Sequence, residues 1–168
     1  MLDTTALRAA YRALLEAAAT VAEAPHRLTP PPGEWNADQI LAHVSLLTAT
    51  TISAASAVAA GQHTTYDNRL ALDTWTIDNV VALTGDNAAL RERLRQQGEV
   101  LCALGGAALT DPELDTLVPT RLLSADTLLL DQPLALRDLI SGLADAELPG
   151  HTDQLLALLA GRSATAAA

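Results

Sequence analysis

Hydrophobic residues recur at steps of three and four along most of this chain, which is the spacing of an amphipathic α-helix. In the first such segment the apolar stripe contains Leu7, Leu14 and Val21, while Arg8 and Arg12 lie off it. The same pattern returns three times. Four long helices are therefore predicted, over residues 5–24, 37–61, 87–105 and 133–159.

Residues that commonly begin or interrupt helices support these boundaries. Asn36 precedes the second helix, and Asp86 or Asn87 precedes the third, where a short polar side chain can accept a hydrogen bond from the first turn. Three consecutive prolines separate the first helix from the second. The last helix is expected to open near Asp131 and Pro133, because proline is tolerated in a first turn.

The segments between the long helices have weaker patterns. Residues 72–83 indicate a short helix, and residues 107–132 contain too many turn residues for a helix, with short extended pieces around 128–130. We therefore expect an all-α fold, a four-helix bundle with a long crossover segment between the third and fourth helices. Residues 1–161 are expected to form one helical domain, and residues 162–168 a flexible tail.

The composition supports a helical protein and excludes some partners. Hydrophobic residues make up 49% of the chain, without Phe, and the formal net charge is −10. No basic stripe is present to bind nucleic acid or an anionic membrane surface. No apolar run is expected to approach the roughly 20 residues that span a bilayer. With no recognisable signal peptide and a single cysteine, we expect a cytoplasmic protein.

The candidate chemistry lies in three side chains on two helices. Glu147 and His151 are four residues apart, which places them on one helical face, and His43 lies at the edge of the stripe of the second helix. Two imidazoles and a carboxylate can hold a divalent metal and leave a coordination position open. Zinc is the expected ion, although nickel or iron would suit the same ligands. Pro149 interrupts the spacing and predicts a kink or break.

Each of these residues also has an ordinary structural interpretation. A histidine on a helix stripe is often a hydrogen-bonded core residue, and Glu147 with His151 could be an exposed pair near a proline. His26 and His63 are expected in solvated loops, with His63 the better substitute ligand. Cys102 lies in an apolar run and is interpreted as a small buried hydrophobic residue rather than a nucleophile.

Two segments of the chain resemble motifs of the DinB-like superfamily. "PPPGEWNADQILAHVSLL" resembles its second-helix motif, in which a Pro-rich approach and a Trp, here Trp35, precede a metal-binding His, here His43. "AELPGHTDQLLALL" resembles its last-helix motif, and its Glu-x-x-x-His form is similar to the mycothiol-dependent maleylpyruvate isomerase branch. The resemblance follows the helix order over most of the chain. Two departures are Pro149-Gly150 within the ligand spacing and Gln154, where that branch often has Asp.

The resemblance implies a function as well as a fold. It implies that His43, Glu147 and His151 bind a divalent metal, typically zinc, at one end of a four-helix bundle. It further implies a low-molecular-weight thiol, such as mycothiol or bacillithiol, as cosubstrate of an S-transferase or isomerase. The other partner would be a small electrophilic molecule. Coordination to a divalent metal deprotonates a thiol that is otherwise mostly protonated at neutral pH.

Two alternatives from other classes remain open at this point. The chain could be a non-catalytic helical module with a degenerate metal site, whose Ala- and Leu-rich surface forms a homodimer. It could also be a metal-dependent hydrolase, which needs a general base beside the metal, and Asp153 is the nearest candidate. The sequence assigns neither a catalytic residue nor a thiol-binding residue.

Overall fold

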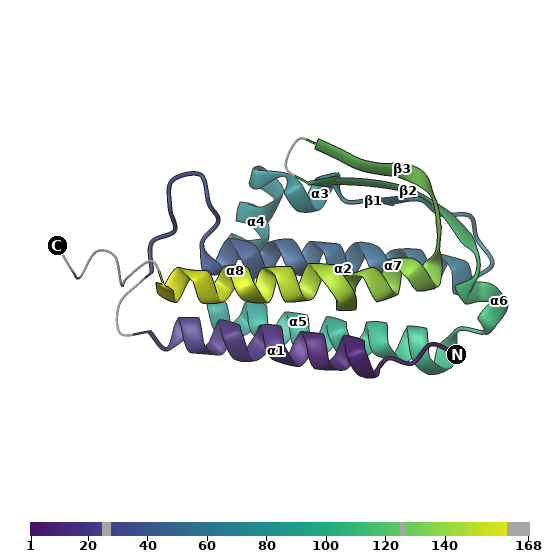
Figure 1. Cartoon of the computed structure of the whole chain (residues 1–168), viewed down its shortest axis with the longest axis horizontal. Helices are drawn as coiled ribbons and strands as arrows, with labels where there is room; N and C mark the ends of the chain where they lie inside the picture. The colour runs from purple at the N-terminus through teal and green to yellow at the C-terminus, as the bar shows by residue number, and fades with distance from the viewer. Residues whose placement is uncertain (25–27, 125–126, 161–168) are drawn as a thin grey trace.

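A computed structural model describes residues 1–24, 28–124 and 127–160, and these are mostly helical with a small three-stranded sheet (Figure 1). The elements occur in the order α1 (Thr5–Ala22), α2 (Ala37–Ala59), β1 (Tyr66–Asp67), α3 (Arg69–Leu72), α4 (Thr74–Thr84), α5 (Asn87–Ala103), the π-helical segment η1 (Leu104–Ala108), α6 (Asp111–Leu114), β2 (Leu117–Ser124), β3 (Thr127–Ala135), α7 (Leu136–Gly142), the π-helical segment η2 (Leu143–Glu147) and α8 (Leu148–Ala160).

Four long helical segments lie side by side, as Figure 1 shows: α1, α2, α5 and the continuous run from α7 to α8. Helix α1 packs on α5 and α8, and α2 packs on the same two helices. All four were predicted from the sequence. Asn36 caps α2 by accepting from the Gln39 amide N–H at 3.0 Å, and the Gln39 side chain accepts from the Asn36 N–H in return. Asp86 accepts from the Ala89 N–H at 2.8 Å and so caps α5.

The core lies between these helices and follows the predicted stripes. The largest fully buried side chains are aliphatic, and they come from nearly every helix: Leu14, Ile40, Leu41, Ile77, Leu90, Leu94, Leu101, Leu114, Leu136, Ile140, Leu148 and Leu155. Burial of this apolar surface is the main favourable term in folding. Gly98 permits a close approach of α5 to α1, because a Cβ there would lie 3.0 Å from the Tyr11 ring.

The sheet amends the expected all-α fold. Strand β2 pairs antiparallel with β3 and parallel with the short β1, so the strand order is β1-β2-β3. The extended pieces expected at 128–130 belong to β3, but β2 was not expected. Asp131 and Pro133, expected to open the last helix, lie in β3, and the helix begins at Leu136. The predicted helix at 72–83 is divided between α3 and α4 because Asp73 caps α4.

The sheet and the two short helices form a second layer over the long helices (Figure 1). Helices α3 and α4 pack on α2, and β3 leads into α7. The buried Asn68 ties this layer together, because its side-chain amide donates to the Leu123 carbonyl at 2.8 Å and accepts from the Leu123 N–H at 2.9 Å. The side chain of Asn68 therefore makes the two hydrogen bonds with the Leu123 backbone that a neighbouring strand would otherwise make.

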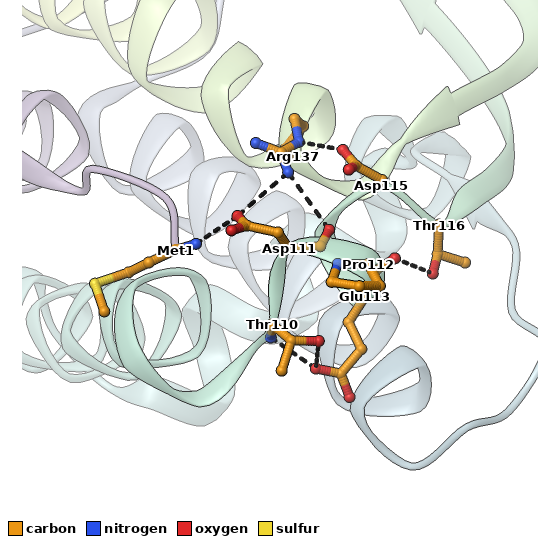
Figure 2. A network of polar contacts seen from close by, with 8 residues as sticks. All are labelled: Met1, Thr110, Asp111, Pro112, Glu113, Asp115, Thr116 and Arg137. Atoms are coloured by element: carbon orange, nitrogen blue, oxygen red, sulfur yellow. Dashed lines mark hydrogen bonds and ion pairs between the residues drawn. The ribbon is translucent and has the colours of Figure 1, made fainter.

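A polar network fastens the end of the molecule where the N-terminus lies (Figure 2). The guanidinium of Arg137 on α7 donates to the Asp115 carboxylate at 2.6 Å and lies 3.6 Å from the Asp111 carboxylate, which also pairs with the Met1 ammonium. These groups are largely exposed, so each pair contributes little to stability. Together they fix α6 against α7.

The expectation that no apolar run approaches the length of a membrane-spanning helix was wrong. Helix α2 is long and apolar enough to cross a membrane by length and composition, with a mean hydropathy of 1.4. The core helix of a soluble protein passes the same test, and 61% of the relevant window of α2 is buried within the protein. The high hydropathy follows from the position of α2, which contacts α5, α8 and the second layer on different faces.

Replacing Tyr11 by Phe should lower the free energy of unfolding by about 1 kcal/mol, because its hydroxyl hydrogen-bonds Thr48 Oγ1 at 2.8 Å in the core. Burial raises the pKa of Tyr11 above its usual range. Denaturant unfolding measures the effect. The matched control is Tyr66→Phe, since the Tyr66 hydroxyl is also buried but lies 3.5 Å from its partner Thr51. An equal loss in both variants would contradict the importance of the Tyr11 hydrogen bond.

Candidate metal centre

His43 is held rigidly between α2 and the second layer. It is 3% exposed, and its Nδ1 lies 2.6 Å from the carbonyl oxygen of Ala71. A carbonyl can only accept, so Nδ1 carries the proton and Nε2 keeps its lone pair. Helix α3 has four residues, and its last carbonyls lack intrahelical partners. His43 therefore satisfies an otherwise unpaired backbone oxygen while its other nitrogen stays free.

The surroundings of His43 keep it neutral. Burial lowers the pKa of His43 to about 4, the largest effect, although the hydrogen bond to Ala71 opposes it. The Trp35 ring packs against the imidazole at a centroid distance of 4.7 Å. At neutral pH the Nε2 lone pair of His43 is consequently available to a metal ion.

The last helix is continuous through Pro149, but it contains a widened turn immediately before that residue. In η2 the Leu148 N–H bonds the Leu143 carbonyl, five residues back instead of four. Pro149 lacks an N–H and would crowd the carbonyl four residues before it in a regular α-helix. A π turn at this point accommodates the ring without breaking the helix. Of the kink or break that the sequence predicts at Pro149, the break is absent from the described helix, and the π turn is the irregularity found there.

The widened turn also decides where Glu147 lies. Regular helical spacing from Leu143 would place residue 147 in the core, but the extra residue of the π turn gives that place to Leu148, which is fully buried. The Glu147 side chain is instead 48% exposed, and that of His151 is 16% exposed. The carboxylate therefore lies at a rim where its charge remains partly solvated, while the His151 ring is mostly buried.

The structure brings the three predicted ligands together. One ligand atom from each of His43, Glu147 and His151 can be chosen so that all lie within 4.8 Å of one another. Glu147 Oε2 lies 3.6 Å from His151 Nε2, and the rings of His43 and His151 are 4.6 Å apart. Contact with His151 holds the pKa of Glu147 below its usual value, so it is ionised at neutral pH. Bonds of about 2.1 Å require ligand atoms about 3.4 Å apart, so binding an ion would draw these side chains closer together.

Gln154 completes the arrangement and was not expected to matter. Its Oε1 lies 2.9 Å from His151 Nδ1, so the tautomer with its proton on Nδ1 donates there and leaves the Nε2 lone pair for a metal ion on the side of Glu147. Metal-binding histidines commonly donate their second nitrogen to an oxygen in this way. Each imidazole thus has an oxygen acceptor for its Nδ1 proton when Nε2 binds a metal, which supports the fit of a divalent ion to these residues.

A hollow of about 500 Å³ opens onto the three ligands. Trp35 forms part of its wall, whereas Trp75 is 73% exposed and lies outside the lining. Leucines of the hairpin, Leu122, Leu123 and Leu129, supply the apolar side. The site therefore has both a ligand set and room for a small molecule.

The other candidates lie elsewhere. His63 is exposed and is not part of the cluster, and His26 lies outside the described residues. Cys102 is buried between α1 and α5, where desolvation raises the pKa of its thiol. Asp153 is exposed and does not line the hollow.

Comparisons with protein-family models, with curated proteins and with solved structures found no match to this chain.

Replacing Gln154 by Leu should weaken zinc binding about 10- to 100-fold, since His151 loses the acceptor that fixes its orientation and tautomer. Gln154→Glu keeps an acceptor and should bind zinc at least as well as the wild type. Competition with a chromogenic chelator gives the affinities. Gln96→Leu, an equivalent change at an exposed position of α5, is the control. An unchanged zinc affinity in the Gln154→Leu variant would contradict the proposal that Gln154 positions His151.

Proposed function

We propose that this chain is a divalent-metal-dependent protein of the DinB-like four-helix type that uses a low-molecular-weight thiol as an S-transferase or isomerase. The observation that carries the proposal is the convergence of His43, Glu147 and His151 from two separate helices, with ligand atoms within 4.8 Å. Zinc is the proposed ion. A cytoplasmic location remains part of the same proposal.

The helical arrangement supports the family part of the proposal. Four long helical segments pack together, and the ligands come from the second and the last of them, as the resemblance implies. Trp35, which belongs to the same motif, packs on His43. The three-stranded sheet covers the site as an addition to the bundle and supplies one wall of the hollow.

The residues of the site suit thiol activation. A divalent metal deprotonates a coordinated thiol and so supplies the nucleophile. Two neutral imidazoles and one carboxylate leave at least one position open in a tetrahedral site. The apolar wall of Trp35 and the hairpin leucines would keep water from the reacting sulfur and accommodate the electrophile. A hydrolase has less support, because its candidate base, Asp153, does not line the hollow.

Loss of free thiol in the presence of an alkyl halide or epoxide tests this function. Zinc-loaded protein should consume thiol faster than zinc alone, and removal of zinc by a chelator should abolish the excess rate. The His151→Ala variant should show no excess rate, whereas His63→Ala should match the wild type. A protein that binds zinc but gives no excess rate with any thiol would exclude the thiol chemistry and leave a metal-binding helical module.

A further inference from the structure

The hollow at the metal ligands adjoins a second, outer hollow of about 770 Å³. Leu72 and Leu123 line both, so the two hollows lie next to each other at these side chains. Helix α3 and the start of α4 supply most of the outer lining. An extended molecule that is bound at the ligands by one end and passes Leu72 and Leu123 would enter the outer hollow.

The charges along this path are mostly negative. The carboxylates of four residues line the two hollows: Glu34, Asp67, Asp73 and Glu147. Arg69 is the one cationic side chain among the described residues that line either hollow, and it pairs with Asp67 at 2.7 Å. Arg121 lies opposite Asp67 on β2 but is paired with Asp131 at 2.9 Å. No described guanidinium on the path is left to bind a carboxylate or phosphate.

A bound divalent ion would not reverse this balance. Its charge is reduced by Glu147 alone among the three protein ligands, since an imidazole binds a metal ion through a lone pair as a neutral ligand. Coordination of a thiolate would remove the remaining positive charge. Glu34 and Asp73 then set the potential that the rest of the bound molecule meets.

Resting on the proposed thiol function, we infer that the cosubstrate is an extended thiol whose remaining part is uncharged or cationic, and that Glu34 and Asp73 disfavour anionic thiols. The apolar middle of the path, Leu72, Leu122, Leu123 and Leu129, accepts an uncharged linker. The carboxylates of Glu34, in the inner hollow, and Asp73, in the outer one, can accept hydrogen bonds from hydroxyl or ammonium groups.

Cobalt-substituted protein gives a direct test, because a thiolate bound to cobalt produces a sulfur-to-metal charge-transfer band. Three thiols of equal length serve as probes: 6-mercaptohexan-1-ol, 6-aminohexane-1-thiol and 6-mercaptohexanoate. Their chains keep the terminal group from chelating the metal, and each affinity is corrected for the thiol's own pKa. The carboxylate-ended thiol should bind on the order of tenfold more weakly than the alcohol, and the amine-ended thiol at least as tightly. Added salt should reduce the difference.

A pair of matched double variants assigns the effect to the path. Glu34→Gln with Asp73→Asn should bring the three affinities to within about twofold, and Asn at position 73 still caps α4. Glu16→Gln with Asp138→Asn changes the net charge equally at exposed positions outside both hollows and should leave the discrimination intact.

The outcomes separate the two proposals. Equal or tighter binding of 6-mercaptohexanoate by the wild type would overturn the inference on charge while leaving thiol coordination in place. Equal loss of discrimination in both double variants would overturn the assignment to Glu34 and Asp73. Absence of cobalt binding, or of a charge-transfer band with every thiol, would overturn the proposed function itself, and the inference with it.

Discussion

His43→Ala and His151→Ala should each lower zinc affinity at least about a thousandfold, so that purified variants contain almost no metal while the wild type holds about one ion per chain. Each variant removes one of three protein ligands, and the other histidine among the described residues, His63, is exposed and outside the cluster, so it does not replace the lost ligand. Removing a ligand should lower metal affinity by more than the roughly 10- to 100-fold loss that follows when the hydrogen-bond partner of a ligand histidine's other ring nitrogen is removed. Elemental analysis of dialysed protein is the measurement.

Thermal unfolding supplies an independent readout of the same site. A ligand that binds only the folded protein stabilises it by about 4 kcal/mol at a thousand times its dissociation constant, so zinc should raise the melting temperature of the wild type by roughly 10 °C. The His43→Ala and His151→Ala variants should show no such rise. His63→Ala is the matched control and should behave as the wild type does.

These variants discriminate between a metal centre and an ordinary core histidine. His43 alone could be explained as a buried imidazole that satisfies the Ala71 carbonyl. That explanation predicts that His43→Ala lowers stability without changing metal content. A wild-type protein that is purified without metal and also refuses added zinc, cobalt or nickel would contradict the metal centre, and a helical interaction module would then be the better proposal.

The helices and the ligand set could be predicted because both depend on local patterns. The stripes of apolar residues identify which face of each long helix is buried, and Asn36 and Asp86 mark two of the starts through side-chain caps. The four-residue spacing of Glu147 and His151 places them on one face of a helix regardless of the tertiary structure. The pairing with His43 needed only the assumption that two of the helices are neighbours.

The strand β2 and the position of Glu147 could not be predicted in the same way. The sheet forms largely from the pairing of β2 with β3 and from the Asn68 side chain, which is 55 positions away from its partner Leu123. Turn-forming residues in that region masked the strand pattern. The π turn before Pro149 shifts the helical register by one residue, and a stripe drawn with constant periodicity cannot anticipate such a shift.

Gln154 stands where the resemblance leads one to expect Asp, and its side chain can make the same kind of hydrogen bond to a histidine. An Asp at this position could accept a hydrogen bond from the histidine Nδ1, and the amide oxygen of Gln154 accepts the same bond at 2.9 Å. The neutral amide adds no charge to the ligand set. The sequence signal was present, because position 154 follows His151 by three residues and so shares its helical face.

Asn68→Asp should lower the free energy of unfolding by about 2–4 kcal/mol, the largest loss we expect from a change of one side-chain atom in this protein. Asn68 is 6% exposed, and its Nδ2 donates to the Leu123 carbonyl. The replacement removes that donor and sets a second oxygen against the carbonyl, so the Leu123 carbonyl loses its partner and a buried charge is left with the Leu123 N–H as its donor. Because Asn68 and Leu123 also line the hollow at the metal ligands, thiol affinity should fall as well.

The same substitution at Asn36 is the matched control. Asn36 uses its side-chain oxygen to accept from the Gln39 N–H at the start of α2, and a carboxylate accepts there equally well, favoured by the helix dipole. Asn36→Asp should therefore leave stability unchanged or slightly raised in denaturant unfolding. The loss in Asn68→Asp should shrink at low pH, because burial raises the pKa of the introduced carboxyl, and its protonated form regains a donor. Equal stability of the two variants would contradict the role of Asn68 in holding the sheet over the site.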